Sequence, residues 1–180
     1  MCSPLFCLGE SAVAEAGVNF IECKETFCVC ISKDYGGRMA EGKITKNVSV
    51  MCFHDELCQV YNALMTALSL LREGSKVTIF FGSRGVNALH KDKVNDLKCM
   101  PDQPKEIGDA VMKRMEEMNL PTAEELLFML YKEGARIFAC PLNVPLFGMT
   151  KADFIEGVEV ANPAVYYKEV VIKADMNLTF

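Results

Sequence analysis

Strand-like and helix-like segments alternate along the chain from Val48 onward. Apolar runs of buried-strand length occupy residues 48–53, 76–81 and 135–140. Between them, apolar residues recur at helical spacing over 55–71 and 122–133. Alternating β and α segments with glycine at the turns predict an α/β fold, a three-layer sandwich in which helices flank a mostly parallel central sheet.

Capping residues mark where the two longer helices begin and end. Asp55 can cap the first helix, and Gly74 follows its last turn. Thr122 stands three residues before Glu125 as in a capping box, and Gly134 ends the second helix.

Two further elements are expected near the C-terminus. Thr150 and Asp153 can cap a short helix that runs to about residue 160. The β-branched and aromatic residues over 165–172 predict a last strand.

The segment 94–120 lacks this alternation. Two prolines interrupt it, and Met112, Met115 and Met118 then recur every third residue. Such a stripe either packs toward the core or, if it is exposed, forms a subunit contact. The sequence leaves both interpretations open.

The chain divides into an N-terminal extension, residues 1–47, and an α/β domain, residues 48–180. Within the extension, 26–32 has the composition of a strand and 34–38 that of a turn. We expect the extension to pack on the domain.

The composition is that of a globular, acidic protein. Of its 180 residues, 51% are hydrophobic and 24% are charged, and glycine and proline are scarce, which excludes a disordered or collagen-like chain. The net charge of −5 provides no basic surface for phosphates, so we expect no nucleic-acid partner.

No segment has the pattern of a signal peptide or a membrane span. Glu10 and Glu15 interrupt the N-terminal residues where a signal peptide would be apolar. The longest nearly apolar run, 63–71, is too short to cross a bilayer. We therefore expect a cytoplasmic protein without a membrane contact.

Nine cysteines are too few for a small disulfide scaffold, and their odd number leaves at least one thiol unpaired. Cys23, Cys28 and Cys30 include no Cys-x-x-Cys pair, and the chain offers two histidines to complete a zinc site. Burial of these cysteines in a strand is the simpler interpretation. We therefore predict neither a metal nor a cofactor.

Candidate functional groups gather where the predicted strands end. In a parallel sheet the carboxyl ends of the strands share one edge, and ligands bind there. His54 and Asp55 follow the first strand, Gly82-Ser83-Arg84-Gly85 follows the second, and Cys140 and Pro141 follow the third. We expect these groups to converge.

Cys140 is the candidate nucleophile. Its place at a strand end, before a proline-bounded loop, fixes its backbone and leaves an opening to solvent. A thiol reacts as its thiolate, which a nearby cation stabilises, and Arg84 can be that cation. The alternatives are a packed, inert Cys140 and a solvated Arg84.

The segment 82–85 can also form a nest of backbone N–H groups for an anion. It lacks the dinucleotide fingerprint and the Lys-Ser/Thr of a P-loop, so we do not expect a nucleotide site. The chain also has no Gly-x-Ser-x-Gly from which to build a serine hydrolase.

Four segments together carry a resemblance to a known family. They are Gly74-Ser-Lys-Val-Thr-Ile-Phe-Phe-Gly-Ser-Arg-Gly85, Pro121-Thr-Ala-Glu-Glu-Leu-Leu127, Glu133-Gly-Ala-Arg-Ile-Phe-Ala-Cys140 and Phe147-Gly-Met-Thr-Lys-Ala-Asp-Phe-Ile-Glu-Gly-Val-Glu159. On these residues the chain resembles the DsrE/DsrF/DsrH-like family, in particular a soluble member of its longer DsrE-like branch. The strand-end cysteine followed by Phe-Gly-Met is the most specific part.

The resemblance implies a fold and a function. Members are small α/β domains of flavodoxin-like topology that assemble into oligomers, and those studied act in sulfur relay. A strand-end cysteine accepts sulfur as a persulfide and passes it to a partner, and it falls on Cys140 here. The resemblance thus implies a sulfurtransferase or sulfur carrier that forms a homo-oligomer. Its implied partners are sulfur donor and acceptor proteins or small sulfur species. Some longer relatives carry a membrane hairpin near 94–120, where this chain has no apolar span.

The pocket beside Cys140 is expected to draw on the strand-end loops and on the loop that follows the cysteine. Its expected members are His54, Gly82, Ser83, Arg84, Gly85, Pro141, Asn143, Phe147 and Gly148.

Two other functions are compatible with the sequence. One is a non-catalytic oligomeric binding module for a small anion or a partner protein, in which Cys140 is packed. The other is a peroxiredoxin-like thiol redox protein, in which a second cysteine resolves oxidised Cys140. The sequence does not say which of the other eight cysteines could reach it.

Overall fold

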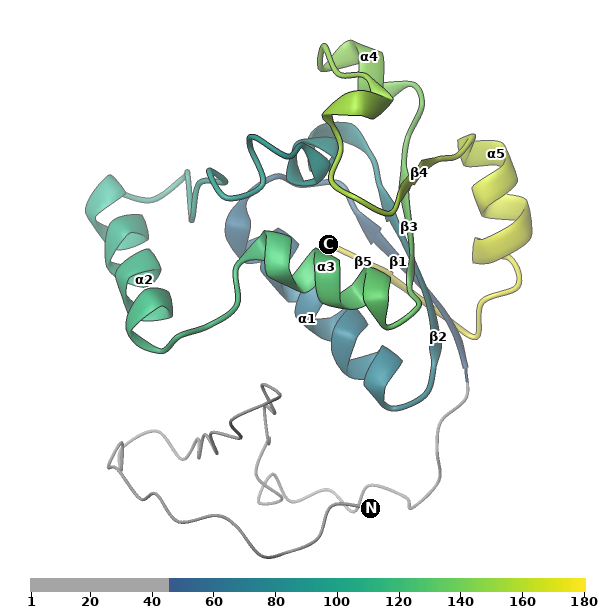
Figure 1. Ribbon diagram of the computed structural model, residues 1–180, viewed down its shortest axis with the longest axis horizontal. Coiled ribbons are helices and arrows are strands. Elements are labelled where there is room, and N and C mark those ends of the chain that lie inside the picture. Colours follow the sequence, from purple (N-terminus) through teal and green to yellow (C-terminus); the bar gives the residue numbers. More distant parts are fainter. Residues whose placement is uncertain (1–45) are drawn as a thin grey trace, which may run out of the picture. The chain divides into compact units, whose positions relative to one another are not determined.

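A five-stranded parallel sheet forms the centre of the protein (Figure 1). The computed structural model describes residues 46–180, which fall within one compact unit. The strands are β1 (Asn47–Cys52), β2 (Lys76–Phe81), β3 (Arg136–Ala139), β4 (Val158–Val160) and β5 (Met176–Thr179). The α-helices are α1 (Leu57–Arg72), α2 (Lys105–Glu117), α3 (Ala123–Lys132), α4 (Asn143–Leu146) and α5 (Pro163–Tyr166). The 3-10 helices are η1 (Ser83–Leu89) and η2 (Lys151–Asp153), and η3 (Tyr167–Val171) is a π-helix.

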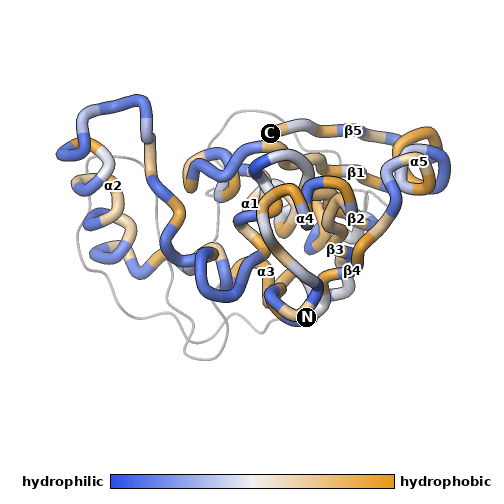
Figure 2. The backbone as a smooth tube through the Cα atoms, turned by 90° about the horizontal axis from the view of Figure 1, so that it is seen from above, coloured by the Kyte–Doolittle hydropathy of each residue, from blue (hydrophilic) through white to orange (hydrophobic). Residues whose placement is uncertain are grey.

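The strands lie in the order β4-β3-β2-β1-β5. Figure 2 looks along the sheet and shows α1 and α3 on one side of the strands and α5 on the other. The predicted three-layer α/β sandwich is therefore confirmed. The strand order differs from the 2-1-3-4-5 order of flavodoxin, because here β1 lies between β2 and the C-terminal strand.

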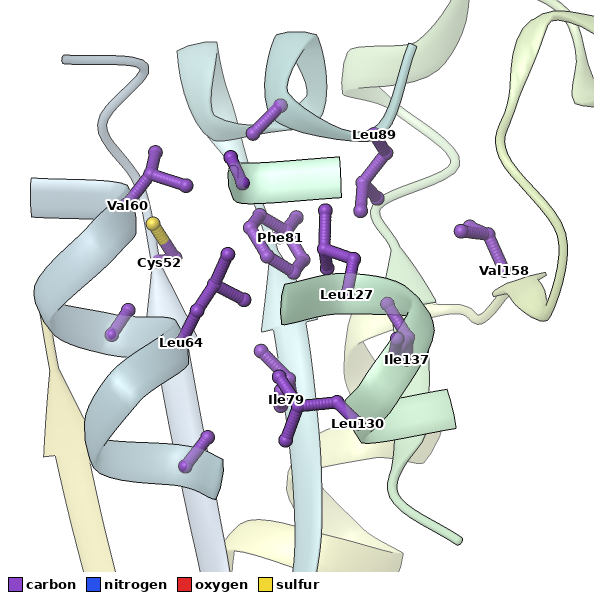
Figure 3. Packing of buried hydrophobic residues seen from close by; sticks show 14 of the residues in the cluster. Cys52, Val60, Leu64, Ile79, Phe81, Leu89, Leu127, Leu130, Ile137 and Val158 are labelled. Atoms are coloured by element: carbon purple, nitrogen blue, oxygen red, sulfur yellow. The ribbon is translucent and has the colours of Figure 1, made fainter. Parts of the chain in front are cut away.

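The main core lies between the sheet and the layer of α1 and α3. Ile79 and Ile137 of the sheet and Leu64, Leu127 and Leu130 of the helices are fully buried there (Figure 3). Alternate residues of a strand face the same side of the sheet, and apolar residues at helical spacing share one face of a helix. The apolar periodicity of the sequence therefore translates directly into this core.

Both long helices of this layer end as the sequence predicts. Gly74 and Gly134 adopt the left-handed conformation, with φ of 95° and 99°, just beyond the ends of α1 and α3. At the start of α3, Thr122 and Glu125 form the predicted capping box, with hydrogen bonds of 2.7 and 3.2 Å. These turns lead the chain back into β2 and β3.

Tyr166 anchors the layer on the second face of the sheet. It is 2% exposed, and its ring stacks on Phe80 at a centroid distance of 4.6 Å and meets Phe138 edge-on at 6.0 Å. Its hydroxyl forms a buried hydrogen bond of 2.8 Å with Oγ of Ser49 on β1. Aromatic burial and this bond together hold α5 against the sheet.

The prediction of a strand over 165–172 is wrong. This segment is helical, in α5 and η3, and the last strand is β5. Oδ1 of Asn162 accepts a hydrogen bond of 2.9 Å from the N–H of Ala164, and Pro163 takes the first helical position. These start signals, together with burial of Tyr166 against the sheet, outweigh the β propensity of the segment.

Two predicted helix boundaries also change. Thr150 and Asp153 do form a capping box, but the helix they start is the single 3-10 turn η2, and 158–160 is strand β4. Asp55 does not cap α1, because its Oδ2 accepts a hydrogen bond of 2.9 Å from Nδ2 of Asn87. Glu56 is the N-cap residue of α1.

Helix α2 lies to the side of α1 and α3 (Figure 1). Met112 and Met115 are partly buried against the main core, whereas Met118 is 49% exposed. Two of the three methionines in the stripe, Met112 and Met115, thus pack toward the core, and Met118 faces solvent. The expectations for 26–32 and for Cys23, Cys28 and Cys30 lie outside the described residues.

We predict that Tyr166→Phe lowers the free energy of unfolding by about 1–2 kcal/mol, because it leaves the buried Ser49 hydroxyl without its partner. Urea denaturation measures this loss. Combined with Ser49→Ala, the change should cost about 1 kcal/mol less than the sum of the two single changes. Strictly additive losses would show that the two hydroxyls do not interact.

Candidate functional site

The carboxyl ends of β1, β2 and β3 lie level with one another. Cys52 pairs with Phe81, and Phe81 pairs with Ala139. Cys140 continues this alignment, because its N–H donates a 2.9 Å hydrogen bond to the carbonyl of Phe81. The strand ends singled out in the sequence therefore share one edge of the sheet.

The backbone of Cys140 is fixed on both sides. Its carbonyl accepts hydrogen bonds of 3.1 Å from the N–H groups of Asn143 and Val144, which begin α4. The thiol position is thus set by the end of β3 and the turn into α4. A fixed backbone at a strand end is the arrangement expected for Cys140.

The Cys140 side chain lies on the second face of the sheet, in an apolar cluster with Phe80, Phe138 and Tyr166. It is 5% exposed. Burial raises the pKa of Tyr166 to about 12, although the hydrogen bond with Ser49 partly opposes the shift. The Tyr166 side chain in this cluster is therefore uncharged at physiological pH.

Backbone hydrogen bonds occupy the glycine-flanked turn after β2. The N–H of Gly82 donates to the carbonyl of Cys52 at 3.0 Å, and the N–H of Gly85 donates to the carbonyl of Gly82 at 2.9 Å. The N–H of Ser83 donates to Oδ1 of Asn143 at 2.8 Å. These three N–H groups are engaged within the chain, so they do not form the expected anion nest.

Neighbouring atoms approach both glycines of this turn too closely to leave room for a side chain. A Cβ at Gly85 would lie 2.5 Å from the carbonyl oxygen of Cys52, and one at Gly82 would lie 2.8 Å from the Phe53 ring. Ser83 between them has a φ of 47°, an uncommon value for a non-glycine residue. The bond from Ser83 to Asn143 ties this strained turn to the loop that follows Cys140.

Arg84 belongs to a charged cluster at the ends of β1 and β2. Its Nη2 lies 2.6 Å from Oε1 of Glu56, and its Nε lies 3.6 Å from Oδ1 of Asp55. His54 joins the cluster, with Nδ1 at 3.2 Å from Oε2 of Glu56. Two carboxylates thus pair with Arg84, the cation expected to assist Cys140.

Glu56 is the most buried carboxylate of this cluster, with a side chain that is 16% exposed. Burial raises its pKa, but a backbone hydrogen bond at Glu56 itself and the charge of Arg84 outweigh burial and hold the pKa below its usual 4.5. Glu56 is therefore ionised at neutral pH and orders the half-exposed Arg84 and His54.

The loop after Cys140 returns the chain to the main core. Phe147 is partly buried against that core, and Gly148 turns the chain with a φ of 69°. Pro141 lies directly after the cysteine, before Leu142, which is 72% exposed. Of the expected pocket residues, Asn143 is the one that joins this loop to the turn after β2.

Sequence reasoning missed several residues of the site. The alternation of β2 and β3 could have placed Phe80 and Phe138 on the face of Cys140. Tyr166 gave no such signal, because its segment has the composition of a strand. Glu56 was missed because its pairing with Arg84 depends on the turn that η1 makes after β2. Asp55 was expected at this strand end, but its ion pair with Arg84 was not.

Cys52 is not positioned to resolve an oxidised Cys140. It belongs to the main core, whereas Cys140 belongs to the cluster on the opposite face, and β2 separates their strands. Neighbouring strands are about 4.8 Å apart, so a disulfide would have to span two strand spacings and the sheet. Burial also raises the pKa of Cys52 to about 11.

Within residues 46–180, no three His, Cys, Asp or Glu side chains come close enough together to hold a metal ion. In the same residues, no helix combines the length and the apolar character that a bilayer-spanning helix needs.

Comparison with known proteins finds similarity to one family. Residues 94–179 match the model of the DsrE/DsrF/DrsH-like family. The sulfur carrier protein DsrE2 of Allochromatium vinosum is 25% identical over 145 residues, which cover 68% of this chain and 91% of the relative. The uncharacterized protein YrkE of Bacillus subtilis is 22% identical over 143 residues, covering 68% and 89%. These matches confirm the resemblance drawn from the sequence.

Solved structures share the fold. The ychN protein of E. coli superposes with a TM-score of 0.54 at 17% identity, over 76% of this chain and 100% of that one. The protein MTH1491 of Methanobacterium thermoautotrophicum, described as of unknown function, gives a TM-score of 0.54 at 17% identity, over 74% and 97%. Both likenesses confirm the α/β architecture.

We predict that Glu56→Gln lowers the free energy of unfolding by about 0.5–1 kcal/mol at neutral pH, a small cost because Arg84 is half-exposed. Since folding lowers the Glu56 pKa, its contribution is complete above the ordinary value of 4.5 and is lost as the pH falls through the folded-state pKa. The difference from wild type should therefore vanish in acid.

Urea denaturation across this pH range checks the prediction. Glu117→Gln is the matched control, because Glu117 lies in an exposed pair with Lys113 on α2 and should show almost no effect. A Glu56→Gln deficit that persists undiminished in acid would rule out ionisation of Glu56 as its source.

Proposed function

Starting from the match to the DsrE/DsrF/DrsH-like family, we propose that this chain carries sulfane sulfur as a persulfide on Cys140 and delivers it to a partner thiol. The observation that carries the proposal is the position of Cys140. It lies at the rigid carboxyl end of β3, within an apolar cluster and inside the segment that matches the family. The relative named a sulfur carrier supports the same role.

The proposed chemistry has two nucleophilic displacements. In the first, the Cys140 thiolate attacks the sulfane sulfur of a donor such as thiosulfate, the new S–S bond forms, and sulfite leaves with the electron pair of the broken bond. In the second, a partner thiolate attacks the outer sulfur of the Cys140 persulfide, and the Cys140 thiolate is the leaving group. No net oxidation or reduction occurs across the cycle.

The surroundings of Cys140 suit a carrier. Phe80, Phe138 and Tyr166 keep bulk water from the sulfur, which limits its loss to thiols in solution. The hydrogen bond between Ser83 and Asn143 fixes the loops on either side of the strand end. We propose that the loop residues Pro141, Phe147 and Gly148 and the turn 82–85 frame the opening through which donor and acceptor reach the sulfur.

Exposed leucines beside Cys140 offer a docking surface for a partner. Leu142 is 72% exposed and Leu146 is 74% exposed, and both lie on the loop and short helix that follow the cysteine. Large apolar side chains that are exposed next to a reactive group favour a protein partner. We propose that these leucines bind the partner protein that receives sulfur from Cys140.

A carrier of this kind needs reduced thiols and works in a reducing compartment, which we propose is the cytoplasm. A peroxiredoxin-like cycle is less well supported, because Cys52 lies on the other face of the sheet from Cys140. The proposal therefore assigns Cys140 to sulfur transfer rather than to peroxide reduction.

We predict that the reduced protein gains one sulfur atom when it is incubated with thiosulfate and a thiosulfate-cleaving sulfurtransferase. Dithiothreitol should then remove this sulfur. Intact-mass spectrometry measures the gain. Cys140→Ser and Cys140→Ala should both lose it, and the alanine variant preserves the apolar surroundings of this buried site.

Cys58→Ser serves as the matched control, because it removes a partly exposed thiol elsewhere and should leave the gain intact. Circular dichroism establishes that each variant is folded. An equal sulfur gain in wild type and folded Cys140→Ala, or no gain in wild type, would overturn the carrier assignment and favour a binding module.

A further inference from the structure

Cys58 and Cys99 bring two thiols together on the side of the sheet opposite to Cys140. Cys58 lies in the first turn of α1, and Cys99 lies in the connection between η1 and α2. Although the two residues are 41 positions apart in sequence, their Sγ atoms are 3.2 Å apart and share a hydrogen bond. To form a disulfide, the sulfur atoms need to approach by about 1 Å, to the bond length of about 2.05 Å.

Two backbone features hold the segments that carry these thiols. The N–H of Leu57, directly before Cys58, donates a hydrogen bond of 2.9 Å to the carbonyl of Lys98, directly before Cys99. On its other side, Cys99 supports α2, because a Cβ at Gly108 would lie 2.6 Å from the Cys99 carbonyl oxygen. The pairing of the two thiols is thus built into the backbone and does not depend on side-chain rotamers alone.

The pair is also open to a reagent. Cys58 and Cys99 are both partly exposed, whereas the other two described cysteines, Cys52 and Cys140, are buried. Burial and the hydrogen bond to Cys58 raise the pKa of Cys99 to about 11, so Cys99 keeps its proton at neutral pH. This arrangement favours Cys58 as the first nucleophile.

We propose that Cys58 and Cys99 form a thiol–disulfide exchange site, distinct from Cys140, that reacts with the disulfides of small thiols such as glutathione. The Cys58 thiolate attacks the small disulfide, forms a mixed disulfide and releases one thiolate. Cys99 then loses its proton and attacks the Cys58 sulfur, and the second small thiolate leaves. The protein dithiol is oxidised by two electrons, the small disulfide is reduced, and the two thiol protons pass to the two released thiolates.

The disulfide would join α1 to the connection that carries α2. Because Gly108 of α2 packs on Cys99, the new bond fixes the base of α2 to the first turn of α1. Oxidation should therefore slow tryptic cleavage of α2 at Lys105, Lys113 and Arg114 in the native protein. The disulfide between Cys58 and Cys99 would thus hold the methionine-bearing face of α2 in place, and reduction would release it.

The test uses the full reduced chain in mixtures of reduced and oxidised glutathione, followed by rapid alkylation, trypsin and mass spectrometry. The expected product links peptide 47–72, which carries Cys58, to peptide 99–105, which carries Cys99. Fragmentation assigns the link to Cys58 rather than Cys52. The cross-link should be lost in Cys58→Ser and in Cys99→Ser and kept in the matched control Cys52→Ala.

The proposal is overturned if the folded wild type accumulates a stable glutathione adduct on Cys58 without the cross-link, or if Cys58 links to a different cysteine. It is also overturned if neither thiol reacts while the protein stays folded. The cross-link does not involve Cys140. Absence of the cross-link would therefore not affect the sulfur-carrier proposal, and absence of sulfur transfer to Cys140 would not affect the disulfide-exchange proposal.

Discussion

The parallel register of β1, β2 and β3 is the constraint on which the rest of this structure depends. It aligns Cys52, Phe81 and Ala139 across three strands and places the next residue, Cys140, one step beyond the edge. The hydrogen bond from Cys140 to the Phe81 carbonyl extends this register to the cysteine itself. Because side chains alternate between the faces of a sheet, Ala139 joins the main core and Cys140 joins the opposite one. The position and the surroundings of the candidate nucleophile follow from this single alignment.

The same alignment separates three kinds of chemistry. The Cys140 thiol lies among aromatic rings on the face covered by α5 and η3. The charged cluster of Glu56 and Arg84 lies at the ends of β1 and β2, where its charges balance one another. The Cys58 and Cys99 pair lies beyond them on the side of α1. The two proposed reactions, sulfur transfer and disulfide exchange, therefore fall on opposite faces of the sheet, which would keep a persulfide on Cys140 away from the dithiol.

Local signals in the sequence were sufficient for strands β1, β2 and β3 and for helices α1 and α3. The Thr122 capping box, the glycines after α1 and α3, and the apolar periodicity all act within a few residues, so they can be recognised without the fold. The segment around Tyr166 could not be assigned in this way. Its β-rich composition suits a strand, but the cap at Asn162 and a contact with Ser49, 117 residues away, decide in favour of a helix. The ion pairs of Arg84 with Asp55 and Glu56 were missed for the same reason, because these residues meet only after the strands pair.

Localising the transferred sulfur within the chain tests the central claim most directly. Trypsin releases residues 137–151 as one peptide in which Cys140 is the sole cysteine. After incubation with a sulfane donor and alkylation of the protein, our account predicts that the added sulfur is found on this peptide. Sulfur found instead on peptide 47–72 or 99–105, with peptide 137–151 unmodified, would contradict it.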